Sequence, residues 1–251
     1  LIALAVLAAS GAAMAQSSVT MFGIVDTGVA YINNANSAGQ NVYGLTTSGN
    51  ATSRLGFRGT EDLGGGLKAG FWLEGEIFGD NGNASGFNFQ RRSTLSLAGN
   101  FGEVRLGREL TPSYNKASSY DLFGQTGIGQ FQGWNEWLGL NGASSVTADT
   151  NNIRSSNMVS YYTPNFGGFT GGVGYGFDEQ TVGKAGRYFG GYAAYDNGPL
   201  SVTVSYDQRN TGFTLAGVSA AGKHNILTVG ASYDLNVAKL IAIAQQSKYE
   251  A

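Results

Sequence analysis

The stretch 153–179 shows a pattern that recurs along the chain. It holds two amphipathic segments joined by a tight turn at Pro164-Asn165-Phe166-Gly167. In the second segment, two kinds of residue alternate with a strict period of two, as in a β-strand that separates two faces. One face carries Phe169, Gly171, Val173, Tyr175 and Phe177, and the other carries Thr170, Gly172, Gly174, Gly176 and Asp178. The pattern predicts a hairpin with one apolar face and one small, polar face.

The same alternation predicts further strands, which bring the expected total to about eleven. The additional segments are Val19–Asn33, Ser53–Asp62, Leu67–Phe78, Phe89–Gly99, Glu103–Arg108, Arg187–Asp196, Leu200–Asp207, Asn225–Asp234 and Asn236–Tyr249. Most are close to the ~9–11 residues that a tilted membrane strand needs. Polar loops are expected at 34–52 and 208–224. The faces of the last segment stay open, because turning Lys239 inward also turns Ile241 and Ile243 inward.

The connections alternate between longer loops and turns of roughly two to four residues, as in outer-membrane barrels. The inward parity carries charged residues, which are Asp26, Arg54, Arg58, Lys68, Glu74 and Arg92. Burying such charges unpaired in a soluble core would cost on the order of several kcal/mol each, whereas a water-filled lumen accommodates them. The sequence therefore predicts an all-β fold, a transmembrane antiparallel β-barrel with an apolar outer wall and a polar lumen.

Composition supports a wall that faces hydrocarbon rather than water. Charged residues make up 13% of the chain, about half the usual share, and the net charge is −2. This balance gives no electrostatic reason to expect a nucleic-acid partner. The chain has no cysteine and one histidine, His224, which is expected in a solvated loop. No metal, cofactor or catalytic site is predicted, and the protein is not expected to be an enzyme.

Residues 1–15 resemble the end of a secretory signal peptide. An apolar run is followed by small residues that finish at Ala13-Met14-Ala15, the A-x-A pattern of a cleavage site. The run is too short for a membrane-spanning helix. Its charged start is missing, and the mature protein is expected to begin at Gln16. Together with the barrel pattern, these features predict export through the periplasm to the bacterial outer membrane.

Four stretches spread over most of the mature chain carry a family resemblance. They are SSVTMFGIVDTGVAY at 17–31, SRLGFRGTEDLGGGLKAGFWLE at 53–74, FGEVRLGRELTPSY at 101–114 and SSNMVSYYTPNFGGF at 155–169. In these stretches the chain resembles the general diffusion porins of Gram-negative bacteria, particularly the betaproteobacterial type. The resemblance implies passive diffusion of small hydrophilic solutes and ions through a sixteen-stranded barrel, usually a homotrimer. It also implies contact with the lipid bilayer and lipopolysaccharide, and insertion by the barrel-assembly machinery.

Single-chain bacterial barrels have an even number of strands, and open strand edges are not tolerated in hydrocarbon. About eleven strands cannot meet these conditions. The barrel domain, residues 16–251, is therefore expected to lack its last strands.

The resemblance also implies a charged constriction inside the barrel. The long irregular region 109–152 matches the family's inward-folded loop by position, and loops of this length are usually functional or disordered. The arginines that match the family's basic wall are Arg54, Arg58, Arg92 and Arg154. Asp121 is the first candidate for the acidic side, followed by Glu109 and Glu136. For any one arginine, a charge that is merely solvated is an equal alternative.

Other functions stay open from the residues alone. A substrate-specific channel, such as a sugar porin, would stack aromatic residues along the lumen, whereas Phe22, Trp72 and Tyr162 are scattered. A closed surface or adhesive barrel would have tight loops at both ends. An outer-membrane enzyme would need a nucleophile with a base, and His224 has no neighbouring carboxylate in sequence. The lumen arginines favour anions slightly, and ion selectivity is not determined.

Overall fold

The computed structural model describes residues 18–82, 88–125, 130–131, 152–181, 183–215 and 218–250. The expected signal peptide at 1–15 lies outside the described residues. Among the described residues, no helix is both long enough and apolar enough to cross a membrane.

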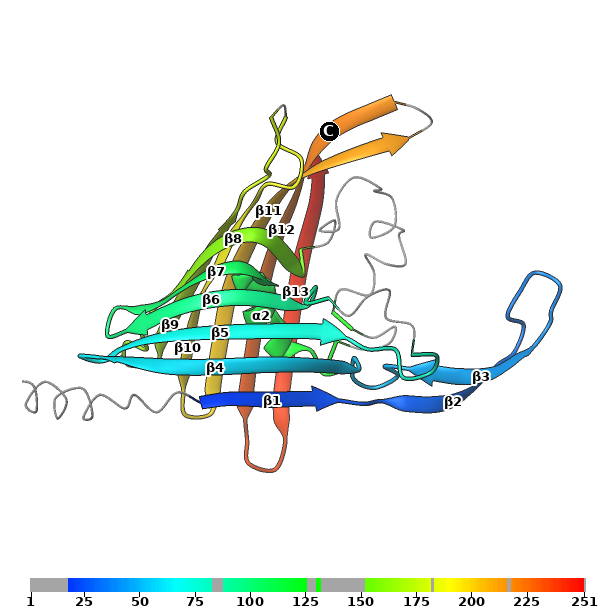
Figure 1. Ribbon diagram of the computed structural model, residues 1–251, viewed down its shortest axis with the longest axis horizontal. Helices are drawn as coiled ribbons and strands as arrows, with labels where there is room; N and C mark the ends of the chain where they lie inside the picture. Colours follow the sequence, from blue (N-terminus) through cyan, green and yellow to red (C-terminus); the bar gives the residue numbers. More distant parts are fainter. Residues whose placement is uncertain are drawn as a thin grey trace, which may run out of the picture.

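Eleven antiparallel strands form one strongly curved sheet (Figure 1). Their order is β1-β4-β5-β6-β7-β8-β9-β10-β11-β12-β13, so that β1 and β13 lie at the two edges. The strands are β1 Ser18–Ile24, β4 Arg54–Gly64, β5 Leu67–Glu76, β6 Arg92–Gly99, β7 Gly102–Leu110, β8 Arg154–Tyr162, β9 Phe169–Gly176, β10 Tyr188–Asn197, β11 Leu200–Leu215, β12 Val218–Asp234 and β13 Lys239–Glu250. They correspond one to one to the predicted segments. The all-β, antiparallel prediction is confirmed.

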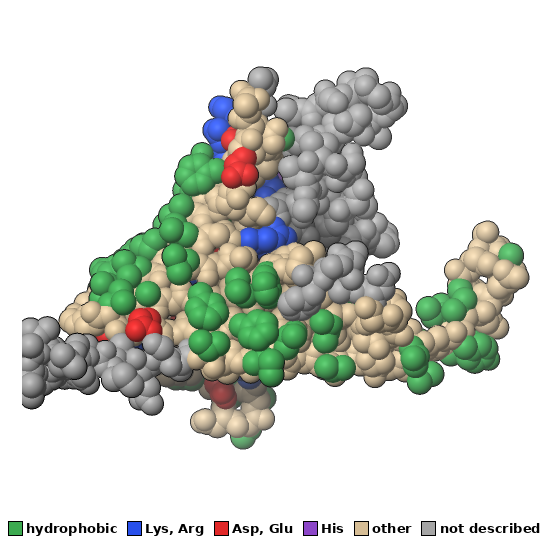
Figure 2. All heavy atoms as spheres, viewed as in Figure 1, with side chains coloured by type: hydrophobic (Ala, Val, Ile, Leu, Met, Phe, Trp, Pro, Cys, Tyr) green, Lys and Arg blue, Asp and Glu red, His purple; other side chains and the backbone are tan. Residues whose placement is uncertain are grey.

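The two faces of the sheet differ as the alternation predicts. On the convex face, apolar residues pair across strands, and the rings of Phe169 and Tyr195 lie 4.5 Å apart. Figure 2 shows hydrophobic side chains spread over the visible face, with few charged side chains there. Polar and small side chains occupy the concave face, where Gln245 donates a hydrogen bond to Thr228 at 3.0 Å.

The pairing of β13 with β12 shows which residues of the last strand lie on the concave face, a point that the sequence left open. Ile241 pairs with Ser232 and Ile243 pairs with Gly230, both on the concave side of β12. Lys239 shares this parity. The short helix η1 contacts both β12 and β13, so apolar residues are accommodated there by protein rather than by water.

A short hairpin extends the sheet at its first edge (Figure 1). It consists of β2 (Thr27–Ile32) and β3 (Val42–Thr47), joined in a separate two-stranded sheet. The predicted strand Val19–Asn33 is therefore interrupted, and part of the predicted loop at 34–52 is a strand. The interruption lies at Asp26, whose carboxylate accepts hydrogen bonds from the backbone N–H groups of Asn50 and Ala51 at 2.8 and 2.7 Å.

The hairpin of β11 and β12 continues past the rest of the sheet (Figure 1). Its strands pair from Leu200–Tyr233 through Leu215–Val218. The prediction of a polar loop at 208–224 is therefore wrong, because backbone pairing continues where the apolar alternation stops. The prediction for His224 is wrong as well. Its side chain is only 3% exposed and its Nε2 lies 2.7 Å from the hydroxyl of Ser247.

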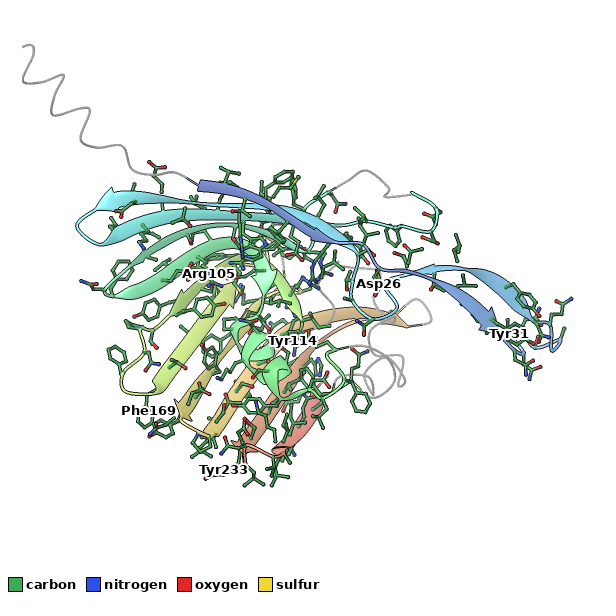
Figure 3. All side chains as sticks on the ribbon, turned by 90° about the horizontal axis from the view of Figure 1, so that it is seen from below. Asp26, Tyr31, Arg105, Tyr114, Phe169 and Tyr233 are labelled. Carbon is green, nitrogen blue, oxygen red and sulfur yellow. The ribbon has the colours of Figure 1, made fainter. Side chains whose placement is uncertain are left out.

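A short helical segment lies inside the curve of the sheet. It comprises α2 (Pro112–Ala117) and η1 (Ser118–Tyr120), and Tyr114 of α2 is labelled in Figure 3. The Thr111 side chain caps α2, and Pro112 occupies its first turn, where a missing N–H costs nothing. The helix contacts β9, β10, β11 and β12.

Glycines on the concave face provide the space for this segment. A Cβ atom at Gly174 would lie 3.1 Å from the ring of Pro112. A Cβ atom at Gly230 would lie 2.7 Å from the ring of Tyr120, closer than packed atoms allow. The inward segment therefore packs against the face of β9 and β12 that carries small and polar residues.

Candidate functional site

Arginines from neighbouring strands converge on the concave side of the sheet. Together they line a cavity of about 460 Å³. Alternation along β4, β6, β7 and β8 turns four of them inward, and Arg105 is labelled on this side in Figure 3. The five are Arg54 from β4, Arg91 just before β6, Arg92 from β6, Arg105 from β7 and Arg154 from β8.

Two largely buried glutamates offset part of this charge. Glu74 on β5 accepts a hydrogen bond from Arg91 Nε at 2.7 Å, and Arg54 Nε lies 3.8 Å from the same oxygen. Glu109 on β7 lies 3.0 Å from Arg105 Nη1 and 3.4 Å from Arg92 Nη2. Both carboxylates are therefore held to the wall by arginine side chains, and Glu109 is held by one arginine of its own strand and one of β6.

The cavity keeps a positive excess. Its lining contains five arginines and two glutamates, a net excess of three positive charges within the lining, and Glu103 outside the lining lies 2.8 Å from Arg105. Arg154 has no carboxylate partner among the residues that the structure describes, and its Nε donates to the carbonyl oxygen of Arg91 at 2.9 Å. A wall of this kind, next to low-dielectric protein, attracts anions into the cavity.

The inward segment completes the cavity from the opposite side with neutral groups. Asn115 of α2 and Gln125, which follows η1, belong to the lining. The hydroxyl of Tyr114 donates to Gln125 Oε1 at 2.9 Å and so orients this amide. Basic groups therefore face amides, and the inward segment adds no charge to the described part of the lining.

Polar contacts fix the inward segment to β10 and β11. Lys116 Nζ lies 2.8 Å from Asp196 Oδ2, and the hydroxyls of Tyr120 and Ser201 lie 2.7 Å apart. Ser113 donates to the buried carboxylate of Asp207, as does Tyr188. The width of the cavity is set by these anchors together with the glycines beneath them.

The candidate acids of the inward loop lie elsewhere than expected. Asp121 accepts hydrogen bonds from the backbone N–H groups of Phe123, Gln125 and Phe131 at 2.9 to 3.3 Å, and it is absent from the described lining. Glu109 lies in β7 rather than in the loop, because β7 continues to Leu110. Glu136 lies outside the described residues.

The remaining predicted residues have different positions. Arg58 belongs to a second cavity of about 370 Å³, which it shares with Arg92 and Arg105. Lys68 lies on β5, where it pairs with Asp62 of β4 and Ala98 of β6. It lines neither of the two arginine cavities. Asp26, labelled in Figure 3, serves the backbone turn at 50–51.

Sequence reasoning missed Arg91 and Arg105. Arg105 alternates with Val104 and Leu106, so its inward parity was available from the pattern. Arg91 directly precedes β6, where the strand ladder has not yet begun, and no parity argument applies there.

Residues 2–251 match the protein family described as Gram-negative porin. The chain is 64% identical over 254 residues to outer membrane porin protein 32 of Delftia acidovorans, covering all of this chain and 70% of that protein. It is 35% identical over 268 residues to an outer membrane porin protein of Bordetella pertussis, covering 96% of this chain and 67% of that protein.

The solved structures give the same picture. The fold is similar to an anion-selective porin from Comamonas acidovorans, with a TM-score of 0.82 and 60% sequence identity over 93% of this chain and 68% of that one. It is also similar to OmpT of Vibrio cholerae, with a TM-score of 0.63 at 18% identity over 93% of this chain and 65% of that one. At that identity the second likeness supports the fold alone.

Proposed function

Because this chain belongs to the family of Gram-negative porins, we propose that its arginine cavity is the constriction of an outer-membrane channel that favours anions. The family is one of general diffusion channels rather than enzymes. Small hydrophilic solutes and ions cross such a channel passively. The proposal concerns the residues that make the channel prefer anions to cations.

The observation that carries this proposal is the positive excess of the cavity. Arg54, Arg91 and Arg154 lie on one wall, and the opposite wall presents the amides of Asn115 and Gln125. Rings or walls of arginine are the usual means by which a pore favours anions. The anion-selective porin from Comamonas acidovorans, 60% identical in sequence, supports this direction of selectivity.

The inward segment has two proposed roles. The described part of the predicted region 109–152 that follows β7, from Thr111 to Gln125, narrows the lumen. Asp121 holds the turn after η1 through its backbone hydrogen bonds. The acidic counterparts of the basic wall are then Glu74 and Glu109, which belong to the wall itself.

Assembly and surroundings are proposed on family membership. They comprise a homotrimer, contact with outer-membrane lipids and lipopolysaccharide, and insertion by the barrel-assembly machinery. A substrate-specific channel is the second candidate, and block of the current by one solute at low concentration would favour it.

The proposal is tested by the reversal potential of the reconstituted channel in a potassium chloride gradient. Wild type should favour chloride over potassium. Arg54→Ala and Arg154→Ala should each lower this preference severalfold, on the order expected when one positive charge is removed from a focused field. Lys184→Ala, at an exposed lysine outside the described cavity lining, is the control and should leave the potential unchanged. A preference for potassium in wild type would overturn the proposal.

A further inference from the structure

Arg58 stands apart from the arginine cluster. It lies four positions beyond Arg54 along β4, about 13 Å at the usual rise per residue, on the side of the short turn at β4–β5. Its cavity contains neither Arg54 nor Arg154. The side chain is exposed and has no carboxylate partner among the described residues. Within the described part of the chain, no carboxylate therefore balances the charge of Arg58.

Two aromatic rings hold this guanidinium. Arg58 Cζ lies 5.4 Å from the ring centroid of Phe22 and 5.1 Å from that of Trp72. The two rings meet edge to face at 5.0 Å. Cations are attracted to aromatic faces at these distances. Because no carboxylate competes for Arg58 within the described part of the chain, the rings are what orient it.

Trp72 is itself fixed on the remaining sides. Arg92 Cζ lies 4.5 Å from the ring centroid of Trp72, and Trp72 Nε1 donates a hydrogen bond to Glu74 Oε2 at 3.1 Å. The indole therefore lies between two guanidinium groups and separates like charges. Gly56 makes room for the other ring, since a Cβ atom there would overlap Phe22 Cζ.

The second cavity has the groups that a small anion requires. Its lining contains Arg58, Arg92 and Arg105. Glu103 and Glu109 are ion-pair partners of Arg105, and Glu109 is also the partner of Arg92, so Arg58 is the arginine of this lining without a carboxylate partner among the described residues. Hydroxyl donors complete the lining, from Thr20, Thr60, Thr94 and Ser96. Guanidinium and hydroxyl groups together form charge-assisted hydrogen bonds to an anion.

We propose that Arg58, held against the rings of Phe22 and Trp72, forms a second anion-binding station on the short-turn side of the arginine cluster. Trp72 is the positioning residue of this station. The proposal rests on the proposed anion preference of the channel and adds a site and a residue to it. Arg92 and Arg105 line both cavities, so an anion passes between the stations without leaving the field of these two arginines. Consecutive weak sites of this kind favour conduction over trapping.

The test centres on changes at Trp72 and Phe22, which leave the number of lumen charges unaltered. Chloride over potassium permeability is measured from reversal potentials for wild type, Trp72→Leu, Trp72→Phe and Arg58→Ala. Trp72→Leu should lower the ratio by roughly twofold, the order of effect that loss of a cation–π contact allows. Trp72→Phe keeps an aromatic face and should restore most of the ratio. Phe22→Leu should act in the same direction as Trp72→Leu.

Two controls separate positioning from general damage. Phe57→Leu removes an aromatic ring from the opposite parity of β4, next to Arg58, and should leave the ratio at the wild-type value. In the Arg58→Ala background, Trp72→Leu should have a smaller effect than in wild type, because the two residues act through one site.

The outcomes are distinct. An anion preference in wild type that Trp72→Leu and Phe22→Leu both leave unchanged would overturn the second station alone. Equal effects of Trp72→Leu and Phe57→Leu would assign Trp72 a purely structural role and would also overturn it. A cation preference in wild type would instead remove the proposed function on which the station rests.

Discussion

At the scale of single residues, Glu74 and Glu109 determine how much positive charge the wall presents. Inward parity identified Arg54, Arg92 and Arg154 from the sequence, because alternation decides which face a side chain occupies. Parity does not tell which carboxylate each guanidinium meets. The register of β6 and β7 brings Arg92 to Glu109, whereas Arg105 meets Glu109 from four positions away on the same strand. The acidic side of the site was predicted in the loop because the family resemblance implies it there.

Replacing Glu109 by Gln should increase the preference for anions. The change removes one of the two negative charges of the cavity and leaves Arg105 with Glu103 as its partner. Breaking a largely buried ion pair should also destabilise the protein, by about 3–5 kcal/mol if the site does not relax. Reversal potentials and thermal unfolding in detergent measure the two effects. Glu179→Gln, at an exposed glutamate between β9 and β10, is the matched control, and an equal shift there would contradict this account.

Asp26 should make the turn at 50–51 sensitive to acid. The backbone N–H groups of Ala51 and Asn50 hold the pKa of this carboxyl below its usual value of 3.8. The contact therefore contributes its full stability above pH 3.8 and loses it as the pH falls through the lowered pKa. Amide NMR shifts of Asn50 and Ala51 should titrate with a midpoint below 3.8. In Asp26→Asn this titration should disappear, and its persistence would assign it to another group.

At the scale of elements, a strand could be predicted from the sequence where its two faces carry different kinds of residue. The strand β9 was predictable because Phe169, Val173 and Tyr175 occupy one face and small or polar residues occupy the other. The end of the β11–β12 hairpin was not predictable, since residues 208–224 are rich in polar and small side chains. Backbone pairing continues there without any contrast between faces. The faces of β13 escaped prediction because η1, which packs against it, is distant in sequence.

Gly230→Val should move the inward segment away from β12 and narrow the channel. The added side chain would overlap the Tyr120 ring, since a Cβ atom alone would lie at 2.7 Å. Overpacking of this kind costs about 1–3 kcal/mol, so both single-channel conductance and stability should fall. Ala231→Val places the same bulk on the outward parity of the same strand and should leave conductance unchanged. Unaltered conductance in Gly230→Val would mean that the segment does not set the width.

At the scale of the whole molecule, the selectivity of the channel should depend on salt. The positive excess acts over a Debye length of about 10 Å at 0.1 M and about 3 Å at 1 M. We therefore expect the chloride over potassium permeability ratio to decline steadily as the mean salt concentration rises between these values. In the Arg154→Ala channel, the permeability ratio should decline less steeply with salt concentration than in wild type. A ratio independent of salt in wild type would point to steric selection instead.

The arginines and the glycines that seat the inward segment lie in different parts of the chain, and this affects how related channels can differ. The arginines come from β4 to β8, whereas the glycines that seat the inward segment come from β9 and β12. The arginines and the inward segment thus precede the turn at 163–168, whereas the glycines that seat the segment follow it. A crossover between two relatives at this turn would place the inward segment of one on the glycine positions of the other. A bulkier residue at either position would then displace the segment while the arginines stay the same, so recombination at one short turn can alter the fit of the segment and preserve the ionic preference.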